Sequence, residues 1–218
     1  MHAAAVAACV MIGPGEERMA TRISLSLAVF LLAVLVSQPA HAVEFSADYV
    51  KRVDGKTARA QIYVKGDWIR LEHQGGVLTD LGYAGVSIVR LDKQVVWLLL
   101  SKRRQYLTVP LRKDHVPPLT ETMEGETARK VAREETLGKY RTTLYEVTAG
   151  SGQSAEHYYQ WVSVEHRLPL RIVSLDRDWA VEYEHVVFSK QRDFFFEVPP
   201  EFAEWQPSPP STPPSEAY

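Results

Sequence analysis

Cysteine is almost absent from the 218 residues: Cys9 is the only one, and it lies near the N-terminus. From residue 43 onward the chain can therefore form neither a disulfide nor a thiolate metal site, and it has no thiol nucleophile. A large charge of one sign is also lacking, because the net charge is only −2 at pH 7. Such a chain gives no indication of nucleic-acid binding. Packing alone must stabilise its fold.

Catalytic and metal-binding motifs are missing as well. The histidines after residue 42 form no HExxH motif and no His-x-His pair; they are His73, His115, His157, His166 and His185. We therefore expect no metal and no cofactor. His157 and His185 could converge if both face inward from adjacent strands, although hydrogen-bonded core histidines are the simpler interpretation. Because no Gly-x-Ser-x-Gly elbow is present, we expect no enzyme activity, with a hydrolase of scattered triad residues as the catalytic alternative.

Only one long apolar run is present, from Ile23 to Val36, and it is shorter than the roughly 20 residues that span a bilayer. Met19-Ala-Thr-Arg22 supplies a basic start before it, and Ala40-His41-Ala42 supplies a small-x-small cleavage pattern after it. We interpret residues 19–42 as a cleavable signal peptide and residues 1–18 as an upstream extension, with translation starting at Met19. The sequence thus predicts a periplasmic protein without a transmembrane span after cleavage.

The remaining chain divides into a domain, residues 43–205, and a tail, residues 206–218. The domain has a suitable length for a single hydrophobic core, and we expect it to be a monomer. The tail holds five prolines among serine, threonine and glutamate, a composition that favours disorder.

Short β-branched and aromatic runs with period-two alternation predict that the domain is mainly β. Turn dipeptides such as Asp54-Gly55, Gly66-Asp67, Gly75-Gly76 and Asp92-Lys93 separate the runs. The expected strands are 44–53, 56–64, 68–74, 86–91, 94–100, 105–111, 141–148, 155–163, 169–175, 179–188 and a short one near 194–198. Residues 112–126 are predicted to form a loop, and Thr127 to Glu135 one short helix.

Three runs of residues in the first half suggest a family. They are Tyr63-Val-Lys-Gly-Asp67-Trp-Ile-Arg-Leu-Glu72, Val89-Arg-Leu-Asp92-Lys-Gln-Val-Val-Trp97 and Tyr106-Leu-Thr-Val-Pro110. The second half adds Tyr159-Gln-Trp161-Val-Ser, Arg167-Leu-Pro-Leu-Arg171 and Phe196-Glu-Val-Pro199. In order and spacing, the chain resembles DUF4412-type periplasmic domains, which are similar to the lipoprotein-carrier superfamily of LolA and LolB. The resemblance covers about residues 44–202 and implies a curved antiparallel half-barrel with a short helix or loop as a lid.

The resemblance and the aromatic content together suggest a binding function in outer-membrane biogenesis. Aromatic and apolar side chains that recur on the strands could hold an acyl chain, a lipid or a lipoprotein in an apolar concave face. The cavity candidates are Trp97, Leu99, Tyr145, Tyr159, Trp161, Val181 and Tyr183. Lys102, Arg103 and Arg104 could contact a partner or anionic headgroups, although a solvated turn is the simpler interpretation. The alternative function is a structural or sensor module that binds an envelope protein.

Overall fold

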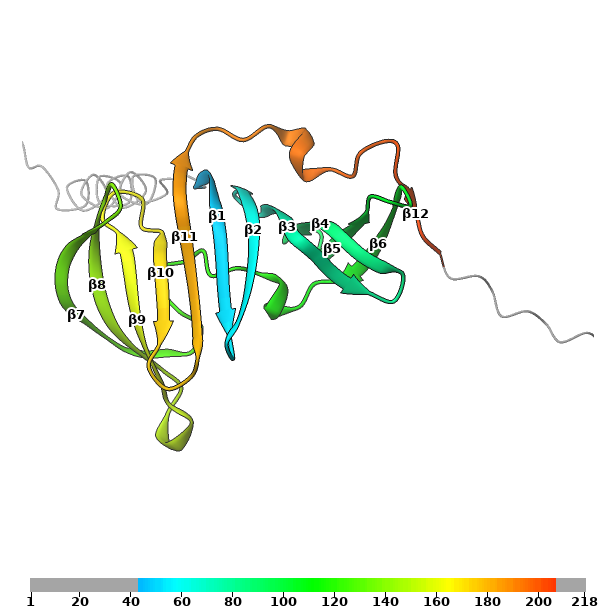
Figure 1. Ribbon diagram of the computed structural model, residues 1–218. Coiled ribbons are helices and arrows are strands. Elements are labelled where there is room, and N and C mark those ends of the chain that lie inside the picture. Colours follow the sequence, from blue (N-terminus) through cyan, green and yellow to red (C-terminus); the bar gives the residue numbers. More distant parts are fainter. Residues whose placement is uncertain (1–42, 207–218) are drawn as a thin grey trace, which may run out of the picture. The chain divides into compact units, whose positions relative to one another are not determined.

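A twelve-stranded sheet is formed by residues 43–206, the part of the chain that the computed structural model describes (Figure 1). Its strands are β1 (Glu44–Val53), β2 (Lys56–Lys65), β3 (Trp68–Thr79), β4 (Gly82–Arg90), β5 (Val95–Leu100), β6 (Gln105–Pro110), β7 (Glu126–Leu137), β8 (Tyr140–Ala149), β9 (Glu156–Ser163), β10 (Pro169–Ser174), β11 (Trp179–Phe188) and β12 (Ala203–Glu204). Three short 3₁₀ turns complete the elements: η1 (Lys113–His115), η2 (Gly152–Ser154) and η3 (Asp193–Phe196). The extension, the signal peptide and nearly all of the tail lie outside the described residues.

The strand order shows how the chain builds this sheet. The order is β12-β6-β5-β4-β3-β2-β1-β11-β10-β9-β8-β7, and every pair is antiparallel except β12 with β6. The chain thus meanders from β1 to one edge at β6, continues through residues 111–125 to the other edge at β7, and meanders back to β11. The sheet is curved and not closed into a barrel, since β7 and β12 are its edges (Figure 1). The predicted fold class, a curved antiparallel half-barrel with little helix, is confirmed.

The apolar side chains of one sheet face, called here the core face, form the main hydrophobic core. It includes Phe45, Ile62, Ile69, Val89, Val181 and Tyr183, all nearly inaccessible to solvent. Residues 111–125, called here the connector, lie against this core through Leu111, Val116 and Leu119. The connector therefore covers part of the core face as a loop.

The opposite sheet face has a smaller core, covered by the C-terminal segment, residues 189–206. Phe196 is completely buried there against Ile88 and Leu99, and Trp68, Trp97, Tyr106, Phe195 and Phe202 surround them. The segment then ends in β12, which lies beside β6 (Figure 1). Both faces of β5 are consequently covered, which agrees with its wholly apolar sequence.

Two predicted elements were wrong. Thr127 to Glu135 is not a helix but most of β7, which pairs with β8 along its length. Residues 194–198 do not form a strand, because Phe194 and Phe195 belong to the 3₁₀ turn η3. The strand expected over 68–74 is longer than predicted, since Gly75 and Gly76, with φ of 93° and 78°, lie within β3 where its pairing with β4 shifts register. No helix among residues 43–206 is long and apolar enough to span a membrane.

Candidate functional site

In the second half of the chain, β10 and β11 pair over a short stretch only. Their register runs from Val173 opposite Ala180 to Arg171 opposite Glu182. Two residues further along this register Pro169 would face Glu184, and proline has no backbone N–H to donate to a ladder. From Glu184 to Phe188, β11 therefore continues without β10 beside it.

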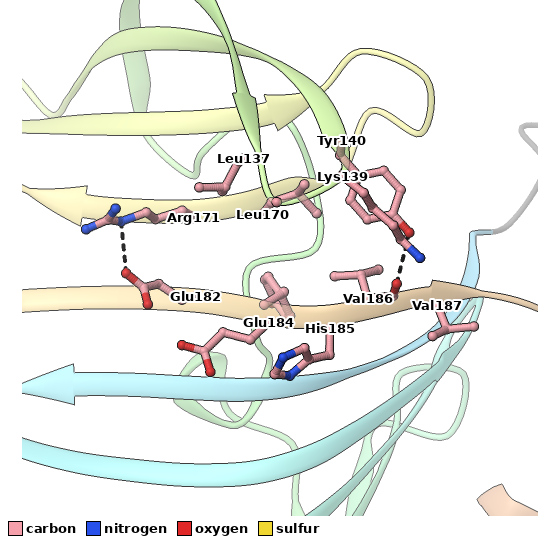
Figure 2. Close-up of a pocket in the computed structure, with 12 residues that line it drawn as sticks. Leu137, Lys139, Tyr140, Leu170, Arg171, Glu182, Glu184, His185, Val186 and Val187 are labelled. Carbon is pink, nitrogen blue, oxygen red and sulfur yellow. Dashed lines mark hydrogen bonds and ion pairs between the residues drawn. The ribbon is translucent and has the colours of Figure 1, made fainter.

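The end of this pairing leaves a cavity of about 630 Å³ on one side of β11 (Figure 2). Its volume lies within the range of about 300 to 1,000 Å³ that is usual for small-molecule sites. The lining comes from the β7–β8 turn, the start of β10 and the second half of β11. It consists of Leu137, Gly138, Lys139, Tyr140, Leu170, Arg171, Glu182, Tyr183, Glu184, His185, Val186 and Val187.

A β-bulge at His185 shapes the β11 wall of the cavity. The pairing of β11 with β1 shifts register between Ser46 and Asp48, and His185 has a φ of 50°. A bulge of this kind changes the direction of the side chains that follow it. Val186 is consequently buried in the core, whereas Val187 remains 49% exposed at the cavity. The Asp48 carboxylate lies 2.8 Å from His185 Nδ1 and holds the ring at the rim.

Tyr140 occupies part of the space that β10 leaves. Its hydroxyl donates a 2.9 Å hydrogen bond to the Val186 carbonyl oxygen (Figure 2). Its ring packs edge-on against Phe188, with centroids 5.6 Å apart. The hydrogen bond satisfies a backbone acceptor that a neighbouring strand would otherwise satisfy, and the ring gives this end of the cavity an apolar wall.

Charged side chains lie around the cavity, and most of them are paired. Arg171 Nε lies 2.9 Å from Glu182 Oε1, which also lies 3.3 Å from Arg52 Nη1. Arg59 pairs with Glu184 at 3.5 Å. Lys139 is the exception: within residues 43–206 it forms no ion pair, and its ammonium lies 5.2 Å from the Tyr140 ring centroid. The cavity thus combines apolar walls with an unneutralised cation at its rim.

The seven cavity candidates from the sequence lie on both sheet faces. Side chains directly opposite each other in a ladder share a face. One row, Tyr145–Gln160–Ile172–Val181, belongs to the core face, together with Tyr183. The adjacent row, Trp161–Arg171–Glu182, belongs to the opposite face.

The other three candidates also lie away from the core face. Tyr159 lies two residues before Trp161 on β9 and therefore on the same sheet face, with the two ring centroids 6.1 Å apart. Trp97 and Leu99 pack with Phe196 under the C-terminal segment. The seven residues therefore do not line one cavity, and of them only Tyr183 borders the cavity at β11.

The remaining candidates are placed separately. Lys102, Arg103 and Arg104 are exposed in the β5–β6 turn, and none of them forms an ion pair with another described residue. His157 and His185 do not converge, because they contact different aspartates, Asp176 and Asp48. Among residues 43–206 there is no cluster of three potential metal ligands.

Sequence reasoning missed most of the cavity lining, including Lys139, Tyr140, Leu170, Val186 and Val187. Their apolar members look like ordinary strand residues, and the β7–β8 turn is distant in sequence from β11. The one local signal was Pro169, because a proline at the start of a strand indicates where a ladder ends.

Comparisons with known proteins place the fold. No protein-family model matches the chain, and no curated protein matches it. Among solved structures, MucB superposes with a TM-score of 0.51 at 14% identity, covering 74% of this chain and 59% of that chain. An uncharacterized conserved protein from Thermus thermophilus superposes with a TM-score of 0.49 at 13% identity, covering 75% of this chain and 90% of that chain. A LolA superfamily protein from Nitrosomonas europaea superposes with a TM-score of 0.35 at 12% identity, covering 72% of this chain and 90% of that chain. At these identities the likeness concerns the fold, and the DUF4412-type assignment stays a prediction.

Proposed function

We propose that the chain is an exported periplasmic binding protein that holds an acyl chain of a lipid or lipoprotein and catalyses no reaction. The cavity beside β11 is the observation that supports this most. Burying one methylene contributes about 0.8 kcal/mol, so a chain of roughly a dozen carbons can bind usefully after the costs of association are subtracted. The LolA-like fold is consistent with such a function.

The proposed ligand site beside β11 differs from the site that the sequence suggested. The connector packs against the core face, and Val181 and Tyr183 are only 1% and 4% exposed in that core. The cavity beside β11, in contrast, is bordered by the half-exposed Val187. Because they border this cavity and are only partly buried, we assign ligand binding to Leu137, Tyr140 and Val187 rather than to the seven aromatic and apolar candidates as a group.

Filling the cavity tests the assignment. We expect Val187→Trp to weaken binding of a fluorescent fatty acid at least tenfold, because the indole would occupy the space for the acyl chain. The matched control is Val131→Trp, since Val131 is also a half-exposed strand valine, at 56%, and does not border the cavity. The measurement is a fluorescence titration of each variant, with a thermal melt to show that both are folded. Equal affinity of the Val187→Trp variant and the wild type would remove the cavity from consideration.

A protein partner is the second candidate function, favoured by the edge strand β7. β7 pairs with β8 only, so the backbone groups of its other side are free to pair with an added strand. MucB, whose fold is similar, has been crystallised in complex with MucA(peri). Native mass spectrometry of protein purified from the envelope separates the candidates: co-purified lipid supports the first, and a stoichiometric polypeptide with an empty cavity supports the second.

The basic turn Lys102, Arg103 and Arg104 is a proposed contact for anionic headgroups in this function. Its three cations are exposed and have no acidic partner among the described residues. Each basic residue near an anionic surface contributes about 1 kcal/mol. Co-sedimentation with vesicles containing phosphatidylglycerol, compared with neutral vesicles, decides whether the turn makes this contact.

A further inference from the structure

The charges around the cavity define which kind of amphiphile it fits. We propose that the ligand carries an anionic head on a single acyl chain, and that Lys139 binds this head at the rim. This inference rests on the proposed function, because it needs an acyl chain in the cavity beside β11. It adds the chemical class of the head and the residue that recognises it.

The acidic groups at the cavity are already neutralised by neighbouring cations. Glu182 lies between Arg171 and Arg52, and Glu184 lies near Arg59. His185 faces Asp48, which leaves neither a free carboxylate nor an unpaired acidic patch in the lining. A cationic or zwitterionic head would therefore find no unpaired anion, whereas a carboxylate finds the ammonium of Lys139.

The position of Lys139 suits this role. It lies in the β7–β8 turn beside Tyr140, whose ring forms a wall of the cavity (Figure 2). Its ammonium is held over that ring, 5.2 Å from the centroid, instead of pairing with an acidic side chain of the described chain. The apolar lining on one side and the cation at the rim match the two ends of a fatty acid.

Calorimetric titration of the full mature chain with laurate and with dodecanol tests the inference. The two probes have equal chain lengths and differ in head charge. We expect laurate to bind about fivefold tighter at low salt, the size of a partly exposed ion pair. Lys139→Met should remove this preference, so that the variant binds laurate and dodecanol about equally. The preference of the wild type should also shrink in about 0.5 M salt, where screening is strong.

A matched control is Lys93→Met. Lys93 likewise places its ammonium over an aromatic ring, 4.8 Å from the Trp97 centroid, but does not border the cavity. Its removal should leave the laurate preference intact. Equal binding of laurate and dodecanol by the wild type, or a preference that survives in Lys139→Met, would overturn the assignment of Lys139 while leaving the acyl-binding proposal standing. Failure of both probes to bind would refute both proposals.

Discussion

Arg90 is a charged side chain that is almost fully buried, with 3% exposure, and it joins β4 to the C-terminal segment. Its guanidinium binds Asp92 through two hydrogen bonds of 2.8 and 2.7 Å, and it also reaches the Glu197 carboxylate at 2.6 Å. The Trp68 ring centroid lies 4.7 Å from it. These contacts explain how a cation is accommodated beside the small core around Phe196.

The Arg90–Asp92 pair makes the stability of the protein depend on pH. The hydrogen bonds from Arg90 lower the pKa of Asp92 from 3.8 to about 2. A lowered pKa means that the Asp92 contribution to the free energy of unfolding is fully present above about pH 4 and is lost as the pH falls through about 2. Urea unfolding at several pH values should therefore show that Asp92→Asn is less stable than the wild type at neutral pH, with the difference vanishing toward pH 2.

Asp67→Asn is the control for this prediction, because Asp67 is exposed and forms no ion pair with another described residue. Its unfolding free energy at neutral pH should be close to that of the wild type. A constant difference between Asp92→Asn and the wild type from neutral pH down to about pH 2 would show that the Arg90–Asp92 pair does not carry the effect.

At the scale of elements, the connector is tied to the sheet by a hydrogen bond from Tyr183. The Tyr183 hydroxyl donates to the Pro118 carbonyl oxygen at 2.9 Å, and the preceding Pro117 is buried. Burial raises the pKa of Tyr183 well above its ordinary value, so the phenol remains protonated and able to donate. One hydrogen bond thus joins β11 to the segment that links the two edges of the sheet.

Removing this hydroxyl should cost the protein stability. We expect Tyr183→Phe to lower the free energy of unfolding by about 1 kcal/mol, since the Pro118 carbonyl loses its partner while the ring packing is kept. Tyr83→Phe serves as the comparison, because Tyr83 is 66% exposed and should change stability little. Denaturant titrations measure both changes. A Tyr183→Phe variant as stable as the wild type would mean that the connector is held by apolar packing alone.

The elements also show what the sequence could predict. Hairpins were found where turn chemistry is local, as at Asp54-Gly55, whose φ values of 48° and 71° match a two-residue hairpin turn. β7 was mistaken for a helix because it is an edge strand whose residues are mostly exposed. Without a buried face, Arg129 to Glu135 shows no period-two alternation, and its charged residues are good helix formers.

The candidate site was less predictable than the fold. Sequence alone could assign Trp97 and Val181 to strands, but their sheet faces depend on register, which long-range pairing determines. Likewise, the cavity exists because the β7–β8 turn at Lys139 meets the stretch of β11 that has no β10 residue beside it beyond Pro169. The local sequence of neither segment shows that the other lies beside it.

At the scale of the whole molecule, the signal peptide expected at residues 19–42 predicts where the mature chain begins. Intact-mass analysis of the periplasmic fraction should find a chain that begins at Val43, because Ala40-His41-Ala42 fits signal-peptidase cleavage. Recovery of the unprocessed chain from the inner membrane would contradict this. A mature chain without its presequence is also the appropriate material for the ligand titrations.

The pairing of β1 with β11 at the middle of the sheet bears on how the protein folds. Phe45 faces Phe188, a partner 143 residues later in the chain (188 − 45). During synthesis β1 can form its hairpin with β2, yet its other edge has no partner until β11 has emerged. Contacts of such large sequence separation slow folding. The sheet therefore cannot be completed until almost the whole domain is available, a delay that would keep the chain open for passage through a membrane.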